Sequence, residues 1–184
     1  MRGKLHGLWE IVRAVLIVVI SAVIIRAYIF QPFVVDGASM NPNLDTNQYI
    51  LTEKITYRFH EPSRGDIIVF KYPLNPSISY IKRIIGLPGD EVKIFQGKVF
   101  VNNKLLDETY LANGESTYVN KVSEDQPYII DLGTNDFFVM GDNRSHSSDS
   151  REWGVLPRNN IIGHLIFVIY PTSDFHKISG FQYN

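Results

Sequence analysis

The sequence predicts a mainly β protein, with antiparallel sheets in a barrel-like sandwich and one transmembrane helix in front of them. The helix is indicated by a long apolar segment, Leu8 to Phe30. The sheets are indicated by the part of the chain after Pro32, where short runs rich in β-branched and aromatic residues begin, each bounded by Gly, Pro, Asn or Asp. Because no helical pattern of about 10–15 residues separates these runs, antiparallel sheets are favoured over parallel ones.

The apolar segment has the length of a membrane-spanning helix. Its centre, Ala14 to Ile25, reads AVLIVVISAVII, and as a helix the whole segment would extend about 34 Å. A bilayer's hydrocarbon core is roughly 30 Å thick, so one crossing of the lipid bilayer is expected. Arg13 and Arg26 lie near the two ends, where long side chains can reach the headgroups.

The flanks of this segment predict its orientation. Positive charge at Arg2, Lys4 and Arg13 favours a cytoplasmic N-terminus, with everything after Gln31 outside. A cleavable signal peptide and a buried core helix would have a similar composition. The retained anchor is preferred, because the chain continues from Phe30 directly into β-like sequence without a spacer or a small-residue cleavage site.

The rest of the chain predicts a domain of short strands. Residues 1–31 are interpreted as the cytoplasmic N-terminus and anchor, and residues 32–184 as the β-rich domain. A more polar stretch at about 105–135 predicts a small β insertion. A hairpin is expected at Gln96-Gly97 and a further turn at Asn102-Asn103. The expected strands are 49–52, 66–71, 80–85, 92–95, 99–101, 137–140 and 161–169.

Composition excludes several classes of function. The 18 basic and 19 acidic residues nearly cancel, so no global field attracts nucleic acid. Without cysteine there is no thiol nucleophile, thiolate zinc site or disulfide. The five histidines lack metal-ligand spacing, and we expect neither a metal nor a cofactor. The oligomeric state stays open.

Two residues suggest a serine nucleophile with a lysine base. Ser39 lies in a tight turn, Gly37 to Pro42, a few residues after the proposed membrane exit, although serine is also a common turn residue. Lys82 is a charge inside the apolar run Tyr80 to Ile85. Burial would lower the pKa of its amine and allow it to act as a general base. The competing interpretation is a strand lysine that points outward.

A polar loop comes after the expected strand at 137–140. The loop, Gly141 to Gly154, is dense in hydroxyls and in charges of both signs, which is typical of a functional loop but also of a solvated turn. Asp142 and Asp149 are candidates to pair with Arg83 and Arg151. His146 is the one histidine among other polar candidates, but no G-x-S-x-G motif accompanies it.

Taken together, the anchor and four ordered blocks resemble the bacterial type I signal peptidases, and the resemblance covers most of the chain. The short insertion is similar to that of the Gram-positive members. The matching blocks are Ser39-Met40-Asn41-Pro42, Arg64 to Phe70, Tyr80 to Asp90, and Gly141-Asp142-Asn143-Arg144 through Ser147, Asp149, Ser150 and Arg151.

The resemblance implies a role for each catalytic residue. Ser39 would be the nucleophile and Lys82 the general base, with Ser147 orienting the amine. Arg83 with Asp142, and Arg151 with Asp149, would support the site structurally.

The resemblance also implies where the substrate binds and where this chain departs from the family. Val35, Asp36, Tyr80 and Ile81 would pair with an extended substrate and form pockets for small residues at P1 and P3. Gly37 stands where Gram-negative members have an oxyanion-hole serine, which leaves more of that task to the backbone N–H of Ser39. Asn43 stands where the family usually has threonine.

By this resemblance, the chain is expected to be a serine endopeptidase in a bacterial plasma membrane. It would cleave signal peptides from exported preproteins on the extracytoplasmic side. A non-catalytic relative that binds extended peptides, as an assembly factor for surface proteins would, is the alternative. A soluble secreted β domain with a cleaved leader is a third possibility.

Overall fold

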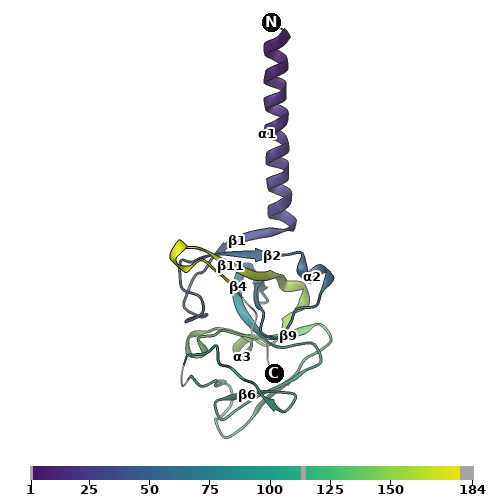
Figure 1. Ribbon diagram of the computed structural model, residues 1–184. Helices are drawn as coiled ribbons and strands as arrows, with labels where there is room; N and C mark the ends of the chain where they lie inside the picture. Colours follow the sequence, from purple (N-terminus) through teal and green to yellow (C-terminus); the bar gives the residue numbers. More distant parts are fainter. Residues whose placement is uncertain (1, 113–114, 179–184) are drawn as a thin grey trace.

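The computed structural model describes residues 2–112 and 115–178. A long helix, α1 (Arg2–Tyr28), rises from a body built of two β-sheets (Figure 1). Its segment Trp9–Tyr28 has a mean hydropathy of 2.3 and is not buried against the rest of the chain. The exposure of this segment excludes its interpretation as a buried core helix and fits a helix in contact with lipid.

The chain leaves the helix earlier than the sequence predicts. The anchor was expected to extend to Phe30, but Phe30 begins a strand, β1 (Phe30–Val34), which pairs with β2 (Tyr49–Glu53). Pro32 has no backbone N–H to donate, yet it is tolerated because β1 is the edge strand of its sheet.

The main sheet is antiparallel throughout, as predicted, with strand order β1-β2-β11-β3-β4-β9-β10 and β12 beside β11. The sheet is open, so the arrangement is sandwich-like and not a closed barrel. Each expected strand is present, with ends that differ by a few residues. Besides β1 and β2, the strands of the main sheet are β3 (Ile67–Tyr72), β4 (Asn75–Gly86), β9 (Asp136–Met140), β10 (Leu156–Pro157), β11 (Ile161–Tyr170) and β12 (His176–Lys177).

A second, smaller sheet lies at the end of the body remote from α1 (Figure 1). It has the order β7-β6-β5-β8. Both expected turns are present, with positive φ at Gln96 and Gly97 and at Asn102 and Asn103, the geometry of two-residue hairpins. The sheet begins before the stretch 105–135 expected as an insertion. Its strands are β5 (Glu91–Phe95), β6 (Lys98–Val101), β7 (Lys104–Leu105) and β8 (Tyr128–Asp131).

The helical segments that the structure describes after α1 are short. Two are α-helical turns, α2 (Thr56–Phe59) and α3 (Ser150–Trp153). Three are 3₁₀ turns: η1 (Arg144–His146), η2 (Arg158–Asn160) and η3 (Thr172–Asp174).

The core covers both faces of the central strands. In β3, Ile67 and Val69 belong to one buried cluster, while Ile68 and Phe70 belong to another. A third cluster, which includes Phe138, packs the main sheet against the small one. Neighbouring side chains of β4 are therefore fixed on opposite faces, and this applies to Lys82 and Arg83.

Candidate active site

The turn between β1 and β2 carries Ser39. Its buried side chains, Met40 and Leu44, lie in the core cluster beneath β1, β2 and β3. Gly37 has a φ of +97°, which a residue with a Cβ adopts only with strain. The core contacts and this glycine hold the serine at one defined place beside the sheet.

Lys82 of β4 points into the structure, so the outward orientation considered from the sequence is wrong. Its side chain is almost completely buried, and Nζ lies 2.8 Å from Oγ of Ser39 and 3.0 Å from the carbonyl oxygen of Ile81. Burial lowers the pKa of Lys82 to about 8, although the nearby negative charges of Asp149 and Asp142 oppose the shift. An amine with this pKa is partly neutral near pH 8 and can accept a proton.

Both expected ion pairs are present beside this amine. Asp142 receives hydrogen bonds from Nε and Nη2 of Arg83, at 2.8 and 2.6 Å. Asp149 receives hydrogen bonds from Nε and Nη2 of Arg151, each of 2.8 Å. Burial alone would raise the pKa of Asp149, but Arg151, the N–H of Gly141 and the hydroxyl of Ser147 hold it below its ordinary value. Fixed negative charge thus lies close to Lys82.

The loop after β9 also binds the serine turn directly. The backbone N–H of Asn143 donates to the carbonyl of Ser39 at 3.0 Å, and its side-chain amide donates to the carbonyl of Ala38 at 3.1 Å. A Cβ on Gly141 would collide with both the Ser39 carbonyl and the Ser147 hydroxyl. Sequence reasoning missed Asn143 and Gly141 as individual contacts, and their place in the block Gly141 to Arg144 was the only signal for them.

Ser147 lies in this loop, but its hydroxyl makes no hydrogen bond to the lysine amine. Its Oγ is buried and makes no hydrogen bond with good geometry. The amine's partners are Ser39 and Ile81. The structure therefore brings Ser147 beside Gly141 and Asp149, and the orienting contact to Lys82 stays a prediction.

A cleft of about 250 Å³ opens over the serine and the lysine. Strand β4 pairs with β3 at Ser79 to Ile81, whereas β9 pairs with β4 only from Arg83 onward, so one edge of this part of β4 is left open. An open edge can take an extended peptide as an additional strand. The cleft is lined by all four expected substrate-binding residues, Val35, Asp36, Tyr80 and Ile81, together with Ser39 and Lys82.

Histidine does not complete a triad here. His146 lines the cleft, but its Nδ1 lies near Oγ of Ser145 (2.9 Å) and Oδ1 of Asn143 (3.3 Å), and the hydrogen bond to Ser39 comes from Lys82. Among the residues that the structure describes, no group of three or more acidic or histidine side chains could hold a metal.

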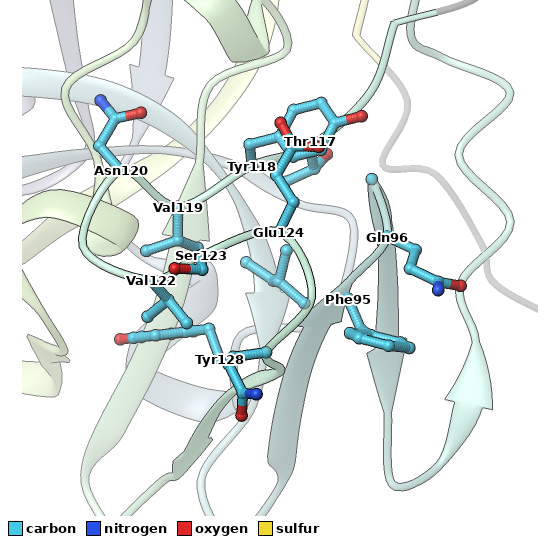
Figure 2. A pocket seen from close by; sticks show the side chains of 13 residues that line it. Phe95, Gln96, Thr117, Tyr118, Val119, Asn120, Val122, Ser123, Glu124 and Tyr128 are labelled. Atoms are coloured by element: carbon cyan, nitrogen blue, oxygen red, sulfur yellow. The ribbon is translucent and has the colours of Figure 1, made fainter.

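A separate pocket of about 250 Å³ lies over the small sheet. Figure 2 shows its labelled side chains, mainly apolar, aromatic or amide groups such as Phe95, Val119 and Tyr128. Glu124 is the one carboxylate in its lining, which contains neither histidine nor lysine. This pocket therefore lacks a lysine or histidine base, and the cleft at Ser39 is the better candidate for catalysis.

Comparison with known proteins places the chain in a family. The family model for signal peptidase, peptidase S26, matches residues 8–170. A signal peptidase I, S form, of Bacillus subtilis is 36% identical over 95% of this chain and 96% of its own length. A probable signal peptidase I of Synechocystis is 38% identical over 88% of this chain and 73% of its own length.

Among solved structures, a signal peptidase I from Enterococcus faecalis matches with 31% identity and a TM-score of 0.48, over 57% of this chain and 97% of that one. The family model covers most of the chain, and relatives above 30% identity align along nearly their whole length. The chain belongs to the signal peptidase family, peptidase S26.

Proposed function

We propose that this chain is a membrane-anchored serine endopeptidase that removes signal peptides from exported preproteins. The observation that carries the proposal is the 2.8 Å contact between Nζ of Lys82 and Oγ of Ser39 at the floor of the cleft. Relatives named signal peptidase I support the substrate class. The non-catalytic alternative has no comparable support, because both reactive residues are present and in contact.

The geometry supports acyl transfer with a lysine base. The neutral amine of Lys82 takes the proton of Ser39 as Oγ attacks the carbonyl carbon of the scissile amide. The tetrahedral intermediate collapses when the lysine returns this proton to the departing amine, which leaves an ester on Ser39. A water molecule, deprotonated by the same amine, then hydrolyses the ester. The backbone N–H of Ser39 is the expected donor to the oxyanion.

The neighbours of the dyad supply position and charge. Ser147 is expected to orient the amine, because its buried hydroxyl lies in the same loop as Asp149, whose charge acts on Lys82. The pairs Arg83 with Asp142 and Arg151 with Asp149 hold the surrounding loop in place. Their carboxylates also keep the pKa of Lys82 from falling further than about 8.

The open edge of β4 supports a binding mode for the substrate. We infer that the signal peptide lies extended between Val35 and Asp36 on one side and Tyr80 and Ile81 on the other. Backbone pairing would fix the register, and the small cleft would favour small residues at P1 and P3.

The anchor would hold this cleft near the bilayer. Lys54 donates to the carbonyls of Arg26 and Ala27 at the end of α1, and the guanidinium of Arg58 lies 5.6 Å from the ring centroid of Tyr28. We infer a bacterial plasma membrane, a cytoplasmic N-terminus and an extracytoplasmic domain from residue 32 onward, with a small insertion at about 105–135. A shared membrane would raise the effective concentration of the preprotein.

A precursor-processing assay tests the proposal. The full chain in detergent is mixed with a preprotein that carries a signal peptide, and the N-terminus of the product is sequenced. We expect cleavage by the wild type and none by Ser39→Ala or Lys82→Ala, with all three proteins folded. Binding of the precursor without cleavage by the wild type would instead favour the assembly factor.

A further inference from the structure

Asn43 lies on the turn that carries Ser39, and its side chain reaches two distant parts of the chain. Its amide nitrogen donates to the backbone carbonyl of Tyr110 and to Oδ2 of Asp142, each at 2.9 Å. These partners are 67 and 99 residues away in the sequence. A primary amide has two N–H donors, and both of them are used here.

The turn does not need this side chain for its own closure. Backbone N–H groups of Asn41, Asn43 and Leu44 donate within the turn at 2.9 to 3.1 Å. Its apolar side chains are buried in the core below. The two hydrogen bonds from the Asn43 side chain are therefore not needed to form the turn. They connect the turn to two other segments of the chain.

Both acceptors are themselves held firmly. Asp142 is buried and receives two hydrogen bonds from Arg83. The ring of Tyr110 lies 4.2 Å from the Arg83 guanidinium carbon, and its hydroxyl is 3.1 Å from Nη2 of Arg144. Arg144 is buried and paired with Glu108. Asn43 thus ties the serine turn to a fixed framework.

We propose that Asn43 is a positioning residue, whose two amide hydrogen bonds hold the Ser39 turn in register with Lys82. Asn43 does not line the cleft, so it acts through Ser39 and not on the substrate. The family threonine expected at this position has a single donor and could satisfy only one of the two acceptors. This inference rests on the proposed function, because it concerns the rate of the serine attack.

Steady-state kinetics of precursor cleavage test the role. The proteins are the full-length wild type, Asn43→Ala, Asn43→Thr and, as a matched control, Asn135→Asp in an exposed turn before β9. Losing a hydrogen bond to a charged acceptor should lower kcat about tenfold in Asn43→Ala, with KM unchanged. Asn43→Thr, which keeps one donor, should fall between Asn43→Ala and the wild type.

The Asn43→Asp variant adds a readout that a merely structural role would not move. It has no N–H donor and brings a second carboxylate beside Asp142, whose charge already raises the pKa of Lys82. We expect the pH midpoint of kcat/KM to move upward relative to the wild type, whereas Asn135→Asp leaves it in place. Above this midpoint, where the amine is neutral, a kcat of folded Asn43→Asp equal to that of the wild type would overturn the positioning role, because this variant lacks both N–H donors.

The outcomes separate this inference from the proposed function. Wild-type cleavage that is unchanged in Asn43→Ala, or a loss confined to KM, contradicts the role of Asn43 alone. Failure of the wild type to cut any precursor contradicts the proposed function. Thermal unfolding is recorded for each variant, and if Asn43→Ala does not fold, the comparison of Asn43→Thr with the wild type decides.

Discussion

The amine of Lys82 lies 2.8 Å from the hydroxyl oxygen of Ser39, although the two residues are 43 positions apart in the sequence. The serine lies on a turn at the edge of the main sheet and the lysine on a central strand, β4. Because the amine is buried, its pKa is lowered from 10.5 to about 8. Burial therefore favours the neutral amine that the proposed mechanism requires.

The first prediction concerns pH and rate. Below pH 8 the amine of Lys82 is mainly protonated and cannot accept the serine proton, so kcat/KM should rise about tenfold per pH unit and level off above about pH 8. Lys82→Arg should be inactive, because a guanidinium is not deprotonated in a protein. His146→Ala should keep the wild-type midpoint. A midpoint near pH 6.5 that disappears in His146→Ala would show a histidine base instead.

The second prediction concerns the stability cost of this lysine. Its folded pKa of about 8 is below the unfolded value of 10.5, so the unfolded chain binds more protons between these pH values and stability rises with pH there. At pH 7 the lowered pKa of Lys82 reduces the free energy of unfolding by its full amount, up to about 3 kcal/mol.

Replacing the lysine with an apolar side chain should remove this cost. Lys82→Met should unfold at a higher temperature than the wild type at pH 7, and the gain should shrink toward pH 10.5. Both proteins are melted across this range in detergent. A variant that is less stable than the wild type at pH 7 would show that the hydrogen bonds to Ser39 and Ile81 outweigh desolvation.

The strands could be predicted because each is a short run rich in apolar, β-branched or aromatic residues, bounded by turn residues. Strand β1 could not, since Phe30 continues the apolar anchor and Pro32 argues against a strand, and only its pairing with β2 shows otherwise. The hairpin at Gln96-Gly97, with strands at 92–95 and 99–101, was predicted, but its membership in the small sheet depends on β8, whose pairing is long-range. Local sequence predicts where a strand lies along the chain, but it does not predict which sheet the strand joins.

In the candidate site, too, some residues could be predicted from the sequence and others could not. Ser39, Lys82 and both carboxylates were found from residue type and order along the chain. Asn43 and Asn143 were not, because an asparagine in a turn has the same local appearance whether or not its amide reaches another segment. Ser147 is the opposite case: its role came from resemblance alone, and in this structure its hydroxyl makes no hydrogen bond of good geometry.

The third prediction tests the close contact between the loop and the serine turn. Gly141→Ala should abolish cleavage, because its Cβ would displace the Ser39 carbonyl and the Ser147 side chain. Gly89→Ala is the control: its φ is +84° but its Cβ would meet open space, so it should lose only about 1–2 kcal/mol of stability. Cleavage and thermal unfolding are measured for both. An active Gly141→Ala would show that the loop moves freely.

The fourth prediction concerns the buried pair of Arg83 and Asp142. Asp142→Asn removes the carboxylate that faces the buried guanidinium, and breaking such a pair costs about 3–5 kcal/mol. Glu61→Gln breaks the exposed pair with Arg158 and should cost less than about 1 kcal/mol. Denaturant unfolding of both variants in detergent measures the difference, and equal losses would contradict it.

The same variant should also change the catalytic pH profile. The negative charge of Asp142 raises the pKa of Lys82, so its loss in Asp142→Asn should move the midpoint of kcat/KM below that of the wild type. Stability and midpoint would then fall together, although a less stable site by itself has no reason to favour the neutral amine. If the midpoint rose or stayed fixed in the folded variant, Asp142 would not act on Lys82 through its charge.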